Sequence, residues 1–201
     1  MKKRLLIIGL ALVMAMTALM PAPVLAAPGQ PGYAAKPFKA DGIAAVNIKG
    51  NIIDYETLGK NFIVIKRVGE GIGGQIISSP DWPEFDQAVF QITENATTVL
   101  NLPNSKFSSE ATGTILVWKS GVLCMTGKYE ALMHGDFDPA SATFFTKVVD
   151  YGQIRLEGIT ETIFDGVTVK GTVSATLIPT EIASGVWTLA GPISIQGTHT
   201  N

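Results

Sequence analysis

The sequence is poor in the residues that form disulfides and metal sites, with one cysteine and two histidines among 201 residues. The single cysteine, Cys124, excludes an internal disulfide, so burial of apolar side chains must stabilise the fold. Two histidines exclude a three-histidine zinc site, and neither an HExxH nor a paired CxxC sequence is present. Charged residues make up only 16% and form no basic stripe, which argues against nucleic acid as a partner. We therefore expect no metal, no cofactor and no nucleic-acid partner.

The N-terminus has the three parts of an export signal. Lys2, Lys3 and Arg4 precede an uncharged run of about 16 residues, which is shorter than the ~20 residues that cross a bilayer. Prolines end this run, and small residues precede a cleavage position after Ala26. We predict a signal peptide over residues 1–26, a secreted or periplasmic location and no membrane span in the mature chain. Cleavage would move the formal net charge from −2 to about −5, which disfavours anionic surfaces as partners.

Residues 27–40 are rich in proline, glycine and alanine. Such a stretch buries too little apolar surface to offset the entropy of ordering it. We predict a flexible leader over 27–40 and a single β domain over 41–201.

The dominant pattern of this domain is an alternation with a period of two. Over 167–177 every odd position is apolar or glycine and every even position is polar, as in a strand with one wet face and one dry face. The ranges 44–52 and 187–196 repeat the pattern, and weaker stretches bring the expected number of strands to about ten. A coiled sheet that closes on itself accommodates inward glycines better than a flat sheet does, and the inward rows contain Gly50, Gly171 and Gly191. We predict an all-β fold, an antiparallel β-barrel of about 8–10 strands, with a β-sandwich as the alternative.

Two segments depart from this pattern. Acids and a proline before Phe85, with apolar residues following at helical spacing, predict at most one short helix over about residues 83–91. The run Gly69–Gly74 formally contains GxGxxG, but a strand-like sequence follows it where a dinucleotide site needs a helix. We expect a hairpin there.

Few residues are candidates for a functional site. We assign no catalytic residue, although Glu130 and His134 would share one face of a strand and are the candidates for acid–base chemistry. Trp82, Phe85 and Phe107 lie outside the clearly alternating stretches. We predict that they contact a ligand at the mouth of the barrel, the alternative being that they cover the open end of the core.

The layout resembles, at the level of the fold, lipocalin-like carriers and the small barrels of allene oxide cyclase and dirigent proteins. We expect an exported binding protein whose barrel holds a small apolar molecule, because eight or so strands leave room for one small ligand. A pocketless cell-surface or extracellular interaction module is one alternative, and a cofactor-free isomerase or cyclase is the other. No enzyme motif such as GxSxG is present, so we favour binding over catalysis. The sequence does not indicate an oligomeric state.

Overall fold

The computed structural model describes residues 34–141 and 143–200. The signal peptide predicted for residues 1–26, and the predicted leader up to residue 33, lie outside the described residues. Strand β1 (Lys36–Ile48) begins inside the predicted leader, because Phe38 and Ala40 alternate inward and are buried. No helix in the described ranges is long and apolar enough to cross a membrane.

The described chain is built almost wholly from strands. After β1 the strands are β2 (Asn51–Leu58), β3 (Phe62–Ser78), β4 (Val89–Asn101), β5 (Lys106–Lys119), β6 (Val122–Phe137), β7 (Phe145–Gly158), β8 (Thr168–Ala183) and β9 (Val186–Thr200). Two single 3-10 turns, η1 (Pro83–Phe85) and η2 (Leu102–Asn104), complete the elements.

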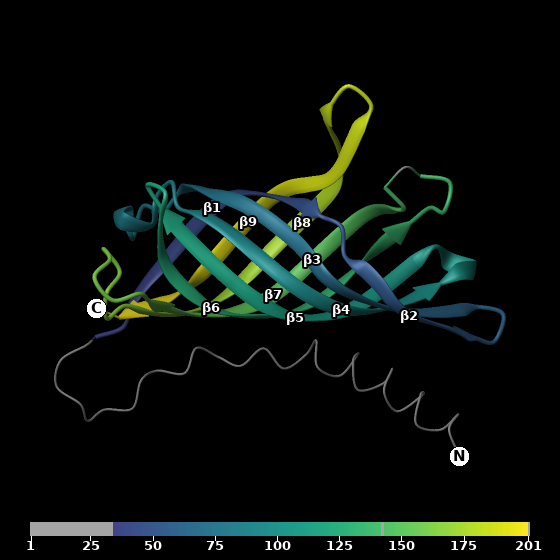
Figure 1. Cartoon of the computed structure of the whole chain (residues 1–201), viewed down its shortest axis with the longest axis horizontal. Coiled ribbons are helices and arrows are strands. Elements are labelled where there is room, and N and C mark those ends of the chain that lie inside the picture. Colours follow the sequence, from purple (N-terminus) through teal and green to yellow (C-terminus); the bar gives the residue numbers. More distant parts are fainter. Residues whose placement is uncertain (1–33, 142, 201) are drawn as a thin grey trace, which may run out of the picture. The chain divides into compact units, whose positions relative to one another are not determined.

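Eight of these strands form a closed antiparallel barrel, as predicted. Each strand from β3 to β9 pairs with the next, β9 pairs with β1, and β1 closes the ring by pairing with the second half of β3. Strand β2 pairs with the first half of β3 and lies outside the ring (Figure 1). The hairpin of β8 and β9 runs past the end of β1 and projects from the barrel (Figure 1).

The sequence divides the long strand β3 wrongly. We expected separate strands and a hairpin around Gly69–Gly74, but β3 runs through this segment with one irregularity between Arg67 and Glu70. Gly69 has a φ of 70° there, which suits glycine. At Gly74 a Cβ atom would come within 2.2 Å of the Phe90 ring, so this glycine lets the ring pack across the strand pair rather than forming a turn.

The helix predicted over residues 83–91 is only the 3-10 turn η1. Its turn is closed by hydrogen bonds from Phe85 N to Trp82 O (2.9 Å) and from Asp86 N to Pro83 O (3.1 Å). From Val89 onward the chain pairs with β3 and β5, because Phe90 and Ile92 alternate inward. Strand pairing therefore overrides the helical spacing of the apolar residues.

Aromatic rings close one end of the barrel, where β1 starts, β9 ends and η1 connects β3 with β4 (Figure 1). The Trp82 ring stacks on Phe85 with centroids 4.8 Å apart and on His199 at 4.3 Å. Phe38 and Phe164 each meet the Trp82 ring edge-on at 5.2 Å. We call these five side chains the aromatic end cluster; all of them are buried.

Candidate functional site

Polar side chains gather inside the barrel, on the inward rows of strands β3 to β7. Inward positions of a barrel this size are usually apolar, so a group of charged residues there requires an explanation. We call this group the interior polar cluster; it consists of Arg67 and Glu70 on β3, Glu94 and Thr98 on β4, Ser109 on β5, Tyr129 on β6 and Asp150 on β7.

The irregularity in β3 brings two of these residues to the same face. Residues three apart in a regular strand point to opposite faces. Because β3 has an extra residue at Gly69, Arg67 and Glu70 both face inward and form an ion pair with Nη1 and Oε1 2.7 Å apart. Glu70 pairs directly across the sheet with Glu94, so two carboxyl groups lie next to each other.

A row of very small residues lines the inner wall beside the cluster. Ala96, Ala111, Ala131 and Gly152 are successive cross-strand partners on β4, β5, β6 and β7. At Gly152 a Cβ atom would come within 2.6 Å of Cε2 of Tyr129, so the Tyr129 ring lies over this glycine. Small side chains in this row leave interior space to the large polar side chains and the Tyr129 ring.

Hydrogen bonds satisfy only part of the cluster. The Tyr129 hydroxyl donates to Oδ2 of Asp150, and Thr98 Oγ1 and Ser109 Oγ lie 3.0 Å apart. Glu94 is 1% exposed, and within the described residues neither of its carboxyl oxygens has a partner. Asp150 Oδ1 and Arg67 Nε are also buried without a partner there. Buried polar atoms in native proteins are nearly always paired, so the unpaired atoms make this cluster the candidate site.

Burial and mutual repulsion change the protonation of the acids. Burial, with the nearby charges of Glu70 and Asp150, raises the pKa of Glu94 to about 8, although Arg67 opposes the rise. Burial also raises the pKa of Asp150 to about 6, against the lowering effect of the Tyr129 hydrogen bond. The pKa of Glu70 is raised by burial despite its pairing with Arg67. At neutral pH the interior therefore holds a protonated Glu94 beside an ionised Asp150.

The cluster extends toward the end of the barrel opposite the aromatic end cluster. The guanidinium carbon of Arg67 lies 5.2 Å from the centroid of the Phe145 ring, a cation–π contact. Phe107, one of the predicted ligand residues, lies beside Phe145 with ring centroids 4.6 Å apart. Arg67 and Phe145 are only partly buried, so this end is the more accessible one.

The other two predicted ligand residues are elsewhere. Trp82 and Phe85 belong to the aromatic end cluster at the far end of β4 from Phe107. The structure therefore brings Trp82 and Phe85 together but does not bring Phe107 to them.

Glu130 and His134 share one face of β6, but that face is the outside of the barrel. The inward positions of this strand are Tyr129, Ala131 and Met133, which leaves the even-numbered residues exposed. His134 stacks on the outward ring of Tyr151 with centroids 6.0 Å apart. Both candidates for acid–base chemistry therefore lie outside the barrel interior.

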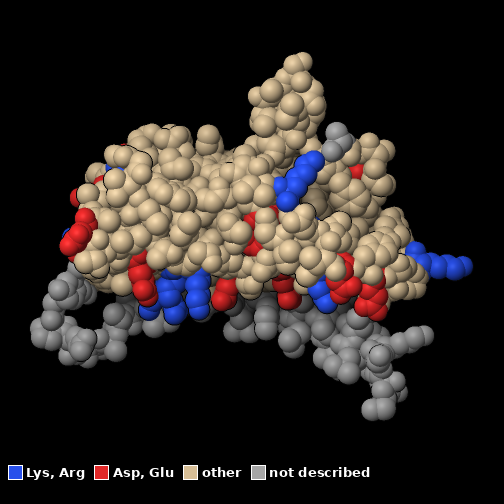
Figure 2. Space-filling model, in the orientation of Figure 1, with Lys and Arg blue, Asp and Glu red and all other residues tan. Residues whose placement is uncertain are grey.

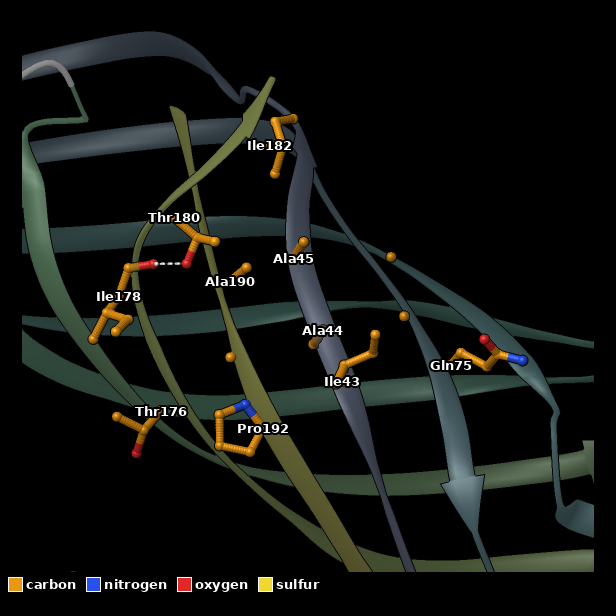
Figure 3. A pocket seen from close by; sticks show the side chains of 13 residues that line it. Ile43, Ala44, Ala45, Gln75, Thr176, Ile178, Thr180, Ile182, Ala190 and Pro192 are labelled. Carbon is orange, nitrogen blue, oxygen red and sulfur yellow. Dashed lines mark hydrogen bonds between the residues drawn. The ribbon is translucent and has the colours of Figure 1, made fainter. Parts of the chain in front are cut away.

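A groove on the outside of the barrel is a separate feature. It has a volume of about 640 Å³ and lies where the β8–β9 hairpin bends away from β1 and β3 (Figure 3). Its lining contains no charged residue and includes Ile43, Ile178, Ile182 and Pro192. In Figure 2 many of the visible charged side chains lie along the lower side of the barrel, whereas the upper surface to the left of the projecting hairpin is mostly uncharged. The outward-facing residues of the groove are not part of the interior polar cluster.

Sequence reasoning missed Glu94, the most deeply buried acid of the cluster. A signal was present, because Glu94 lies in the row of alternate residues that contains Phe90, Ile92, Ala96 and Leu100 on one strand face. A charged residue within an apolar row is a reason to suspect a buried functional group.

Among residues 34–141 and 143–200, no three or more His, Cys, Asp or Glu side chains are placed to hold a metal ion. Comparison of the chain with models of protein families, with curated proteins and with solved structures finds no match.

Proposed function

We propose that the protein binds a small, mostly apolar molecule inside the barrel and that Glu94 anchors the polar group of this ligand. One observation carries the proposal: the Glu94 carboxyl is 1% exposed and has no partner among the described residues. Leaving a buried polar group unsatisfied costs about 1–3 kcal/mol, so a complementary ligand group would recover that free energy.

The surroundings of the acids support a mostly apolar ligand. The inward rows next to the cluster consist of alanines, glycines and branched or aromatic side chains. Ligand sites commonly combine such a lining with a few polar groups that orient the molecule. The basic start and uncharged run at the N-terminus support the further proposal that this binding takes place outside the cytoplasm.

Mass spectrometry of the protein purified from its host tests the proposal. We expect a native mass above that of the chain, with the difference lost on denaturation. Glu94→Gln should lower the occupied fraction several-fold, since the anchoring carboxyl is lost, whereas Glu130→Gln, the same change on the outside of β6, should leave it unchanged. A wild-type chain that is bare under native conditions would contradict the proposal. The denatured mass also checks cleavage after Ala26.

A second function is favoured by the different pKa values of the two acids. Asp150, with a pKa of about 6, and Glu94, with a pKa of about 8, provide a base and an acid at neutral pH. A cofactor-free isomerase could use Asp150 to remove a proton from carbon next to a carbonyl while Glu94 donates a hydrogen bond to the carbonyl oxygen. Asp150 exchanges the proton that it has removed with solvent and returns a proton to another carbon of the ligand, which completes the isomerisation.

Hydrogen exchange in D2O distinguishes this enzyme from a carrier. An isomerase should introduce deuterium at carbon in its co-purified carbonyl ligand, and Asp150→Asn should abolish the exchange while Glu130→Gln does not. A ligand recovered without deuterium at carbon would exclude the isomerase and leave the binding function in place.

A further inference from the structure

The unpaired atoms of the interior polar cluster indicate what kind of polar group the ligand carries. The cluster contains three carboxyl groups, Glu70, Glu94 and Asp150, and one guanidinium, Arg67. Arg67 already pairs with Glu70, and Tyr129 already donates to one oxygen of Asp150. Within the cluster, the buried atoms without a partner in the described structure are both oxygens of Glu94, one oxygen of Asp150 and one nitrogen, Arg67 Nε. When Glu94 is ionised, the unmet hydrogen bonds of the cluster are therefore mainly ones that need a donor.

Electrostatics restricts the ligand further. A carboxylate or phosphate would place another negative charge beside acids that already repel one another, and its oxygens could not donate to the free oxygen of the ionised Asp150. A neutral hydroxyl offers one donor for three oxygens. An alkylammonium group offers three N–H donors and a positive charge, which matches both the count and the sign.

We infer that the barrel interior recognises the ammonium group of a small, mostly apolar amine, with Glu94 and the free oxygen of Asp150 as its hydrogen-bond acceptors. This inference rests on the proposed function and names the chemistry of its ligand. The aromatic rings at the accessible end are consistent with it, because Phe145 already holds one cation, Arg67, over its face.

Glu94 must ionise when the amine binds, because only a negative carboxylate matches the positive charge of the ammonium group. A carboxyl that is protonated in the free protein must lose its proton to accept from an ammonium, so binding releases a proton below a pH of about 8. The affinity should therefore rise with pH, by up to about tenfold per pH unit between pH 6 and 8. An aliphatic amine stays charged over this whole range, since its pKa is about 10.

Calorimetry with three probes of equal chain length tests the inference: hexylamine, 1-hexanol and hexanoate. We expect hexylamine to bind wild-type protein at least about tenfold more tightly than either other probe at pH 8. Titrations in two buffers of different ionisation enthalpy should show release of about one proton per hexylamine near pH 7.

Two matched variants assign the effect to the interior. Glu94→Gln should weaken hexylamine binding about tenfold or more and remove the proton release, because a neutral amide cannot ionise. Glu130→Gln, an exposed acid on β6, should change neither.

The failures are distinguishable. Binding of 1-hexanol or hexanoate as tight as that of hexylamine overturns the amine while retaining a ligand site inside the barrel. A co-purified molecule without an amino group overturns it as well. No binding by any probe, together with a bare chain in the native mass spectrum, overturns the proposed function itself.

Discussion

Replacing Trp82 by alanine is expected to lower the free energy of unfolding by about 3–5 kcal/mol. The Trp82 side chain is 4% exposed and lies against Phe38, Phe85, Phe164 and His199, so its loss removes contacts with every other member of the aromatic end cluster. These residues come from β1, η1, the β7–β8 connection and β9, so the Trp82 ring joins four separate segments of the chain.

Urea unfolding at fixed pH measures this effect, and the same substitution at an exposed tryptophan is its control. Trp187 is 45% exposed on the projecting hairpin, so Trp187→Ala should change the stability by no more than about 0.5 kcal/mol. A loss below about 1 kcal/mol for Trp82→Ala would show that this ring does not close the barrel end.

The second large effect is a fall in stability as the pH rises, caused by the interior acids. Glu94 has a folded-state pKa of about 8, against an ordinary value of 4.5. A group whose pKa is raised by folding stabilises the folded state fully below its unfolded pKa, and that contribution is lost as the pH rises through the folded pKa. Glu94 should therefore reduce the free energy of unfolding by up to about 1.4 kcal/mol per pH unit between its two pKa values.

The pH range and one substitution, with its control, separate the effect of Glu94 on stability from that of Asp150. Folding raises the pKa of Asp150 from its ordinary value of 3.8 to about 6, so this acid changes the stability mainly below pH 6. The change in the free energy of unfolding between pH 6 and 8 therefore comes mainly from Glu94. We expect wild-type protein to lose about 2 kcal/mol over that interval and Glu94→Gln to lose far less. Glu130→Gln should follow the wild-type curve. Parallel curves for wild type and Glu94→Gln would mean that Glu94 is ionised in the folded protein.

The strand content and the barrel could be predicted from the sequence because alternation is a local pattern. In β8 the inward residues Val169, Val173 and Leu177 are separated by polar outward residues, so the face of each side chain is visible in the sequence. Inward glycines such as Gly191 then favoured closure over a sandwich, and the pairing of β1 with β3 confirms closure.

The interior polar cluster could not be predicted in the same way. Around Glu94 the sequence reads Thr-Glu-Asn, so polar residues occupy both faces and hide the apolar row in which Glu94 lies. In β6 the outer face carries Leu132, so both faces of the strand are partly apolar. The sequence therefore does not show whether Glu130 and His134 face the interior or the outside of the barrel. Arg67 and Glu70 both face inward because of one irregular residue in β3. This residue lies where the neighbour of β3 changes from β2, whose pairing ends at Val68, to β1, whose pairing starts at Gly71, and such a change cannot be recognised in the local sequence.

The predicted fall in stability with pH, the proposed ligand and the proposed catalytic function all depend on one claim, that Glu94 is a buried acid without a protein partner. Its titration, followed by carbon-13 NMR of the side-chain carboxyl and assigned with Glu94→Gln, tests this claim most directly. The account predicts a midpoint near 8 in the ligand-free protein. A midpoint near the ordinary value of 4.5 would contradict it, because it would show that the carboxyl is hydrated or paired and is no anchor for a ligand.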